Sequence, residues 1–161
     1  MNDISGGNLD LAMLTTVGAL QVPYVCMHMQ GDPATMQVNP QYNNVVTDVL
    51  DFFIQQVEKC HQVGIKDIII DPGFGFGKTI AHNFQLLKNL RALELLHCPI
   101  LVGISRKSTI YKTLNTSAAE ALNGTTVLNT IGLMYGAQIL RVHDVREAKE
   151  AIELYIAMQK A

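Results

Sequence analysis

The chain has 161 residues and a hydrophobic fraction of 48%, which is enough for one domain with a sizeable buried core. Its 12 Lys and Arg residues against 14 Asp and Glu residues give a net charge of −2, which excludes a broad positive field for nucleic acid or an acidic membrane. No apolar stretch approaches the roughly 18 residues that span a bilayer, and the first residues lack the pattern of a signal peptide, so we expect a cytoplasmic protein.

Helices and strands are predicted to alternate along the whole chain. Apolar positions that recur every three or four residues predict helices over residues 9–20, 45–60, 84–93, 118–128 and 145–156. Short apolar runs predict strands over residues 24–26, 67–70, 100–104 and 138–140. Because a helix separates each pair of strands, we expect right-handed crossovers and a parallel sheet that is buried on both faces.

Each predicted strand ends in a cluster of polar and glycine residues. These clusters begin at Met27, Asp71, Ser105 and Arg141, and a fifth, residues 2–7, starts the chain with no strand predicted before it. In α/β proteins with parallel strands, active sites lie at the carboxyl ends of the strands. The pattern therefore predicts functional residues at these positions, and we also expect that the beginning of the fold is missing.

Two architectures fit this order of elements. The length suits a five-stranded doubly wound sheet of the flavodoxin type. A (β/α)8 barrel needs about 250 residues, so this chain could supply only about half of one. A different polar group follows every strand, whereas a doubly wound sheet gathers its ligand groups at one switch point, and this variety favours the partial barrel.

Residues 71–79 invite a phosphate-loop interpretation because they end in Gly-Lys-Thr, but Pro72 stands where that pattern needs glycine. The more informative residue is Asp71, a carboxylate at the end of an apolar strand. Burial of a carboxylate is costly unless it is paired, and a carboxylate can accept two parallel N–H bonds from the edge of a flat heterocycle. A helix-capping or turn role for Asp71 stays open. The glycines after it would allow a close ligand approach, with Phe74 and Phe76 as aromatic walls.

Two later strand ends carry cations. In the segment 105–108, Ser-Arg-Lys-Ser, a strand passes into a helix, so Ser108 with Lys107 predicts an anion or carboxylate site, although adjacent cations often only face solvent. Strand alternation is expected to place Arg141 and His143 on the same face, where they would suit a phosphate or pyrophosphate. The three cysteines lie far apart without CxxC spacing, which predicts free thiols in a reducing compartment.

Together these segments resemble the dihydropteroate synthase family of the bacterial folate pathway. The resemblance covers the whole chain in order and is carried by Asn2-Asp3-Ile4, residues 27–33 with Met36-Gln37, residues 71–78, residues 105–108 and Arg141-Val142-His143-Asp144. It implies that residues 1–161 form the carboxyl-terminal half of a (β/α)8 TIM barrel, from about the end of strand 4 to strand 8. The family condenses 6-hydroxymethyl-7,8-dihydropterin pyrophosphate with 4-aminobenzoate to give 7,8-dihydropteroate and pyrophosphate.

The resemblance also implies roles for residues of a pterin pocket. Asn2 and Asp71 would hydrogen-bond the pterin ring. Met27 and Gly103 would line the pocket, and Lys107 would reach the pterin carbonyl.

The remaining implied roles concern catalysis, pyrophosphate and 4-aminobenzoate. Arg141 would stack on the pterin and, with His143, bind the departing pyrophosphate, so these two residues and Lys107 are the expected catalytic groups. Ser108 would hold the carboxylate of 4-aminobenzoate near Phe76.

The first three βα loops of the family have no counterpart in this sequence. The resemblance therefore implies a reaction that requires Mg²⁺, with no metal ligand in this chain, and a chain that is inactive alone. It also implies competition by sulfonamides and a homodimer. Two alternatives stay open: a methyltetrahydrofolate:corrinoid methyltransferase-like enzyme, and a non-catalytic half-barrel that binds pterin or associates through its exposed edges.

Overall fold

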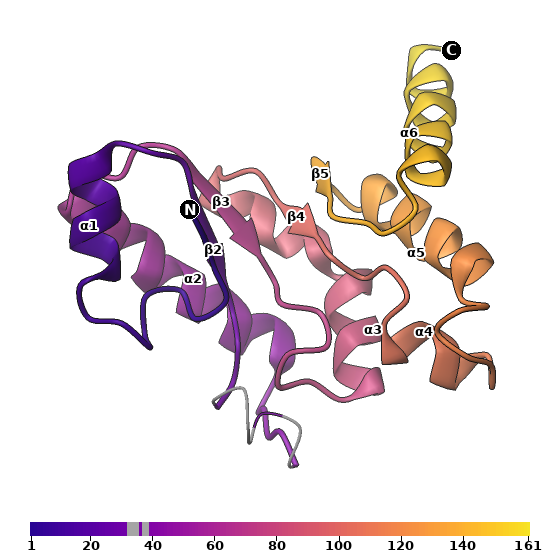
Figure 1. Ribbon diagram of the computed structural model, residues 1–161, viewed down its shortest axis with the longest axis horizontal. Coiled ribbons are helices and arrows are strands. Elements are labelled where there is room, and N and C mark those ends of the chain that lie inside the picture. The colour runs from indigo at the N-terminus through magenta and orange to yellow at the C-terminus, as the bar shows by residue number, and fades with distance from the viewer. Residues whose placement is uncertain (32–35, 37–38) are drawn as a thin grey trace.

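The computed structural model describes residues 1–31, 36 and 39–161. Its helices are α1 (Met13–Leu20), α2 (Val45–Gln62), α3 (Ile80–Lys88), α4 (Ser108–Thr113), α5 (Leu122–Met134) and α6 (Val145–Lys160), with a 3-10 helix η1 (Leu90–Leu96). Its strands are β1 (Asn2–Asp3), β2 (Tyr24–Met27), β3 (Ile68–Asp71), β4 (Leu101–Val102) and β5 (Ile139–Leu140). The chain forms an open arc from α1 to α6 (Figure 1). Asp32, Pro33 and Gln37, which belong to the segments that carry the resemblance, lie outside the described residues.

The predicted helices and strands are confirmed, with shifted boundaries. The segment predicted over 84–93 divides into α3 and η1, and α3 begins early because the Thr79 hydroxyl accepts a hydrogen bond from the His82 backbone N–H at 3.1 Å. The segment predicted over 118–128 becomes helical only at Leu122. β1 was not predicted, since a strand of two residues has no periodicity to detect.

The strands are parallel and follow one another in chain order. β1 pairs with β2, β2 with β3, and β4 with β5, and a parallel bridge between Ile70 and Ile100 joins β3 to the segment that leads into β4. A flavodoxin-type sheet would place its first strand between the second and third. The observed order excludes that architecture and is the order of a (β/α)8 barrel.

The two faces of the sheet differ in burial. Cys26, Ile70 and Val102 have no exposed surface and join a core with α1, α2, α3 and η1 on one face. The alternating side chains Val25 and Ile69 remain half-buried on the other face. The expectation of a sheet buried on both faces is therefore wrong at Val25 and Ile69, because the helices of this core cover one face only, whereas it holds at the strand ends, where Met27 and Asp71 are buried on the same face. In a barrel the opposite face points toward the axis.

Burial in this core accounts for the properties of the cysteine thiols. Cys26 and Cys60 are buried and Cys98 is partly buried, and all three are free, as predicted. Burial raises the pKa of the Cys60 thiol to about 11, so this group stays protonated and packs as a small apolar side chain.

No helix of the described part of the chain is long and apolar enough to cross a bilayer.

Candidate functional site

Four of the residues predicted from the sequence stand at the carboxyl edge of the sheet. Met27 and Asp71 end β2 and β3 and are partners in the strand register. Gly103 directly follows β4, and Arg141 directly follows β5. Because side chains alternate along each strand, Met27 and Asp71 belong to the face that the helices leave uncovered. Arg141 reaches the same face through its ion pair with Asp71 and passes Gly103 on the way.

Asp71 is the buried charged group of this edge. Its side chain has no exposed surface, and its Oδ1 accepts a hydrogen bond from the Gly73 amide at 2.8 Å. Its Oδ2 has no hydrogen-bond partner, although the Arg141 Nη2 lies 3.3 Å away as an ion pair. Burial raises the pKa of the carboxyl, and the Gly73 amide, Arg141 and Lys107 oppose that rise. Asp71 therefore stabilises the turn at Gly73 through Oδ1, while Oδ2 is ion-paired but accepts no hydrogen bond.

Lys107 lies over the loop that follows Asp71. Its Nζ donates to the Phe74 carbonyl and stands 4.7 Å from the centroid of the Phe76 ring. Burial lowers the pKa of Lys107 to about 8, while Asp71 raises it and Arg141 lowers it. The ammonium is thus held by a backbone carbonyl and an aromatic face, in the electrostatic field of Asp71.

Arg141 passes close to Gly103. A Cβ on Gly103 would lie 2.6 Å from the Arg141 Nη2, so the absence of a side chain gives the guanidinium its path toward Asp71. The Arg141 side chain is 40% exposed, which leaves part of the guanidinium accessible from outside the protein.

The predicted strand alternation of Arg141 and His143 is wrong, because β5 ends at Leu140. Arg141 pairs with Asp71, whereas the Nδ1 of His143 lies 3.0 Å from the Ser105 Oγ. The two side chains are positioned by different partners, and not by a shared strand.

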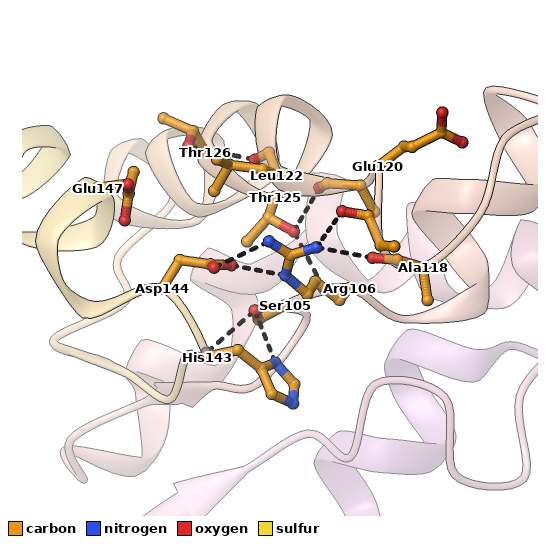
Figure 2. A network of polar contacts seen from close by, with 12 residues as sticks. Ser105, Arg106, Ala118, Glu120, Leu122, Thr125, Thr126, His143, Asp144 and Glu147 are labelled. Carbon is orange, nitrogen blue, oxygen red and sulfur yellow. Dashed lines mark hydrogen bonds and ion pairs between the residues drawn. The ribbon is translucent and has the colours of Figure 1, made fainter.

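A second polar network joins the loops after β4 and β5 (Figure 2). The Arg106 guanidinium donates two hydrogen bonds to the Asp144 carboxylate, at 2.8 and 2.9 Å, and these hold the pKa of Asp144 below its usual range. Arg106 also donates to the carbonyls of Ala118 and Ala119. The interpretation of Arg106 as a cation that only faces solvent is therefore wrong. Neither Arg106 nor Ser105 was a predicted site residue.

Lys78 is another functional candidate that the sequence did not reveal. It is 3% exposed, and its Nζ lies 2.9 Å from the His28 Nδ1 and donates to the carbonyls of Gly73 at 3.1 Å and Phe76 at 3.0 Å. Burial lowers its pKa to about 7, with Asp71 raising and Lys107 lowering the value. Lys78 thus ties the end of β2 to the loop after β3. The Gly-Lys-Thr segment was the available signal, although it suggested a phosphate loop.

The other predicted residues lie at the border of this arrangement. Asn2 is exposed in β1 and aligns with Val25, on the same face as Asp71 but two strands away. Ser108 is the first residue of α4 and is half-buried, as is Phe76 beneath Lys107. The expectation of Phe74 as an aromatic wall is wrong, because its side chain is buried in the hydrophobic core. The structure therefore brings Asp71, Lys107 and Arg141 together most directly.

The described residues do not fit a metal ion such as Mg²⁺. Within residues 1–31, 36 and 39–161, no group of 3 or more His, Cys, Asp or Glu side chains is placed to hold one. The cations near Asp71 would also compete with a metal for that carboxylate.

Comparisons with known proteins point to one family. Residues 1–143 match the family described as pterin binding enzyme. The chain is 42% identical over 160 residues to the dihydropteroate synthase of Escherichia coli strain K12, which covers 94% of this chain and 57% of that protein. It is 42% identical over 163 residues to the dihydropteroate synthase of Haemophilus influenzae, which covers 100% of this chain and 59% of that protein.

A solved structure extends the likeness to three dimensions. The crystal structure of Yersinia pestis dihydropteroate synthase with a sulfonamide drug complex matches with a TM-score of 0.95 at 41% identity, covering 99% of this chain and 58% of that chain. The fold is therefore part of a (β/α)8 barrel. The chain spans less than two thirds of the length of these relatives.

Proposed function

The chain belongs to the family of pterin-binding enzymes, and we propose that residues 1–161 are the carboxyl-terminal portion of a dihydropteroate synthase barrel. The whole enzyme would condense 6-hydroxymethyl-7,8-dihydropterin pyrophosphate with 4-aminobenzoate to give 7,8-dihydropteroate and pyrophosphate. The observation that carries the proposal is the fully buried Asp71, whose Oδ2 lacks a hydrogen-bond partner in the described part of the chain. Buried acceptors are nearly always hydrogen-bonded, so a ligand is expected to complete this one.

A pterin ring suits the environment of Asp71. The 2-amino group and N3 form a flat edge with adjacent N–H donors, and a carboxylate accepts such a pair in parallel. Oδ1 keeps a lone pair beside its bond from the Gly73 amide, so both oxygens can serve the ring. Met27, the register partner of Asp71, would pack against the ring, and Asn2 and Gly103 would lie along its border.

The chemistry needs a stabilised leaving group and no covalent protein nucleophile. The bond between the exocyclic methylene carbon of the pterin and the bridging oxygen breaks, and its electron pair leaves with pyrophosphate. The amine of 4-aminobenzoate forms the new C–N bond and releases a proton to solvent. Arg141 and His143 would bind the departing pyrophosphate, and Lys107 would hold the pterin carbonyl while the ring delocalises positive charge. The pKa of Lys107, about 8, keeps this group mostly cationic near neutral pH.

We place 4-aminobenzoate beside the loop that follows β3. Phe76, whose ring faces the Lys107 ammonium, offers an aromatic wall for the benzoate ring. Ser108 would donate its hydroxyl to the carboxylate. The sulfonamide drug named for the Yersinia pestis structure supports a corresponding competition at this site.

Metal, compartment and assembly complete the proposal. Mg²⁺ would be bound by residues outside this chain, because the described residues do not form a site for it. The free thiols support a cytoplasmic location. A homodimer, or association through the half-buried face that carries Val25 and Ile69, would shelter apolar surface.

The function is tested by complementation. The chain is expressed alone and together with the amino-terminal part of the Escherichia coli synthase, and 4-aminobenzoate-dependent pyrophosphate release is measured. We expect no turnover alone and turnover in the mixture that Asp71→Asn abolishes. Turnover by the isolated chain would contradict its expected inactivity. Methyl transfer from methyltetrahydrofolate to a corrinoid, without synthase activity, would favour the methyltransferase alternative.

The half-buried sheet face favours one second candidate, a non-catalytic half-barrel that self-associates. Sedimentation of the isolated chain distinguishes this candidate, because a concentration-independent monomer would contradict it. A dimer that also binds pterin without turnover would support it.

A further inference from the structure

The loops after β4 and β5 are joined by two adjacent pairs of residues. Ser105 contacts His143, and the next residues, Arg106 and Asp144, form a two-bond ion pair (Figure 2). The Ser105 Oγ also accepts a hydrogen bond from the His143 backbone N–H at 3.2 Å. His143 is therefore held at both its backbone and its ring, while its side chain remains exposed.

The hydroxyl of Ser105 contacts one ring nitrogen of His143, so its hydrogen bonds bear on where the ring carries its proton. Ser105 is 3% exposed, and its hydroxyl has one hydrogen to donate. In the described part of the chain, the Nδ1 of His143 lies 3.0 Å from this hydroxyl, and it can accept the hydrogen only when Nδ1 itself carries no proton. If Nδ1 carried the proton instead, the Ser105 hydroxyl would receive two hydrogen bonds and its own hydrogen would be buried without an acceptor, which is costly.

We propose that Ser105 is a positioning residue that holds His143 in the tautomer with its proton on Nε2, so that the exposed ring nitrogen donates a hydrogen bond to a diphosphate group. The choice of ligand rests on the proposed function. A neutral ring with its proton on Nδ1 would present a lone pair to the anion and repel it. The Arg106–Asp144 pair fixes the loop next to His143, so the ring is oriented before the ligand arrives.

The unsubstituted chain gives the first test. Long-range ¹H–¹⁵N NMR of the histidine rings at about pH 8, where an ordinary imidazole is neutral, reports which ring nitrogen is protonated. We expect His143 to show a single tautomer, with Nε2 protonated and Nδ1 accepting a hydrogen bond. A ring protonated mainly on Nδ1 overturns the inference, whatever the activity of the protein.

Variants test the role of the hydroxyl. Ser105→Ala should let the Nδ1-protonated form appear and weaken the binding of inorganic pyrophosphate by about three- to tenfold, the usual worth of one hydrogen bond. Ser105→Thr keeps the hydroxyl and should restore the single tautomer. Ser117→Ala, which removes an exposed hydroxyl, is the matched control and should change neither measurement.

A double-mutant cycle separates positioning from general stability. If Ser105 acts through His143, Ser105→Ala should have no further effect on pyrophosphate affinity once His143→Ala is present. Equal, additive losses in the two backgrounds overturn the inference while leaving the proposed function intact. Absence of pyrophosphate binding with the expected tautomer present overturns the diphosphate ligand and, with it, the proposed function, but leaves the hydrogen-bond assignment supported.

Discussion

The strand end at β3 and the strand ends at β4 and β5 use their charged groups in opposite ways. Asp71 is fully buried and keeps one oxygen without a hydrogen bond, although three cations influence its pKa. Arg106 and Asp144 are partly exposed, and each satisfies the other through two hydrogen bonds. The β3 end keeps an acceptor oxygen for the proposed ligand, whereas the Arg106–Asp144 pair fixes the loop that carries His143.

Burial sets the size of the effects expected at the two ends. Electrostatic interactions are strong in the low-dielectric interior around Asp71 and weak for pairs that solvent reaches. Substitutions at the β3 end should therefore change binding and stability more than substitutions in the Arg106–Asp144 pair.

The largest expected effect is that of Asp71→Asn on pterin binding. The amide has a similar shape but presents one acceptor and one donor, so it cannot pair with two adjacent N–H groups. We expect affinity to fall by about 2–3 kcal/mol, or roughly 30- to 150-fold. Calorimetric titration with a dihydropterin measures it, with Asp67→Asn, an exposed neighbour, as the control. If Asp71→Asn binds the dihydropterin as tightly as the unsubstituted chain, the β3 end has no special role in binding and does not differ from the β4 and β5 ends.

Lys78→Met tests the buried cation that ties β2 to the loop after β3. Methionine preserves much of the apolar stem but leaves the carbonyls of Gly73 and Phe76 without their donor. We expect the free energy of unfolding to fall by about 1–3 kcal/mol in urea denaturation. Lys88→Met, at an exposed position on α3, should stay within about 0.5 kcal/mol of the parent chain. A Lys78 variant as stable as the Lys88 variant would contradict this role.

The same lysine predicts a pH dependence. Burial lowers the pKa of Lys78 to about 7 from its ordinary value of 10.5, which it regains on unfolding. Between these values the unfolded chain binds more protons than the folded chain, so stability should rise as pH increases from about 7 toward 10.5. Urea denaturation across this pH range measures how steeply the free energy of unfolding rises with pH, and we expect Lys78→Met to make that rise smaller. Lys107, with a pKa of about 8, contributes with the same sign, so some slope should remain.

Much of the β3 end could be predicted from the sequence. The apolar run Ile68–Ile70 indicated a strand, and a lone carboxylate at its end indicated Asp71. Parallel strands bring their carboxyl ends to one edge, which is why Lys107 and Arg141 could be expected near it.

Side-chain contacts between different strand ends could not be predicted in the same way. Ser105 and His143 are 38 residues apart, and Lys78 and His28 are 50 apart, so no local periodicity links either pair. Their hydrogen bonds exist because neighbouring strands end at the same edge, which is a tertiary property. The strand alternation assumed for Arg141 and His143 failed for a related reason, since the length of β5 is set by its pairing with β4.

The smallest expected effect belongs to Asp144→Asn. The pair with Arg106 is partly exposed, and the amide retains one acceptor for the guanidinium, so stability should fall less than in Lys78→Met. Because the pKa of Asp144 is lowered in the folded chain, its contribution is present above the unfolded value and disappears as pH falls through the folded one. Denaturation midpoints near neutral pH and in acid should therefore separate the variant from the parent only in the neutral sample. The pyrophosphate affinity of Asp144→Asn should fall less than that of Ser105→Ala, since Asp144 fixes the loop and Ser105 contacts the ring itself. A larger loss in Asp144→Asn would show that the ion pair, and not the serine, controls the position of His143.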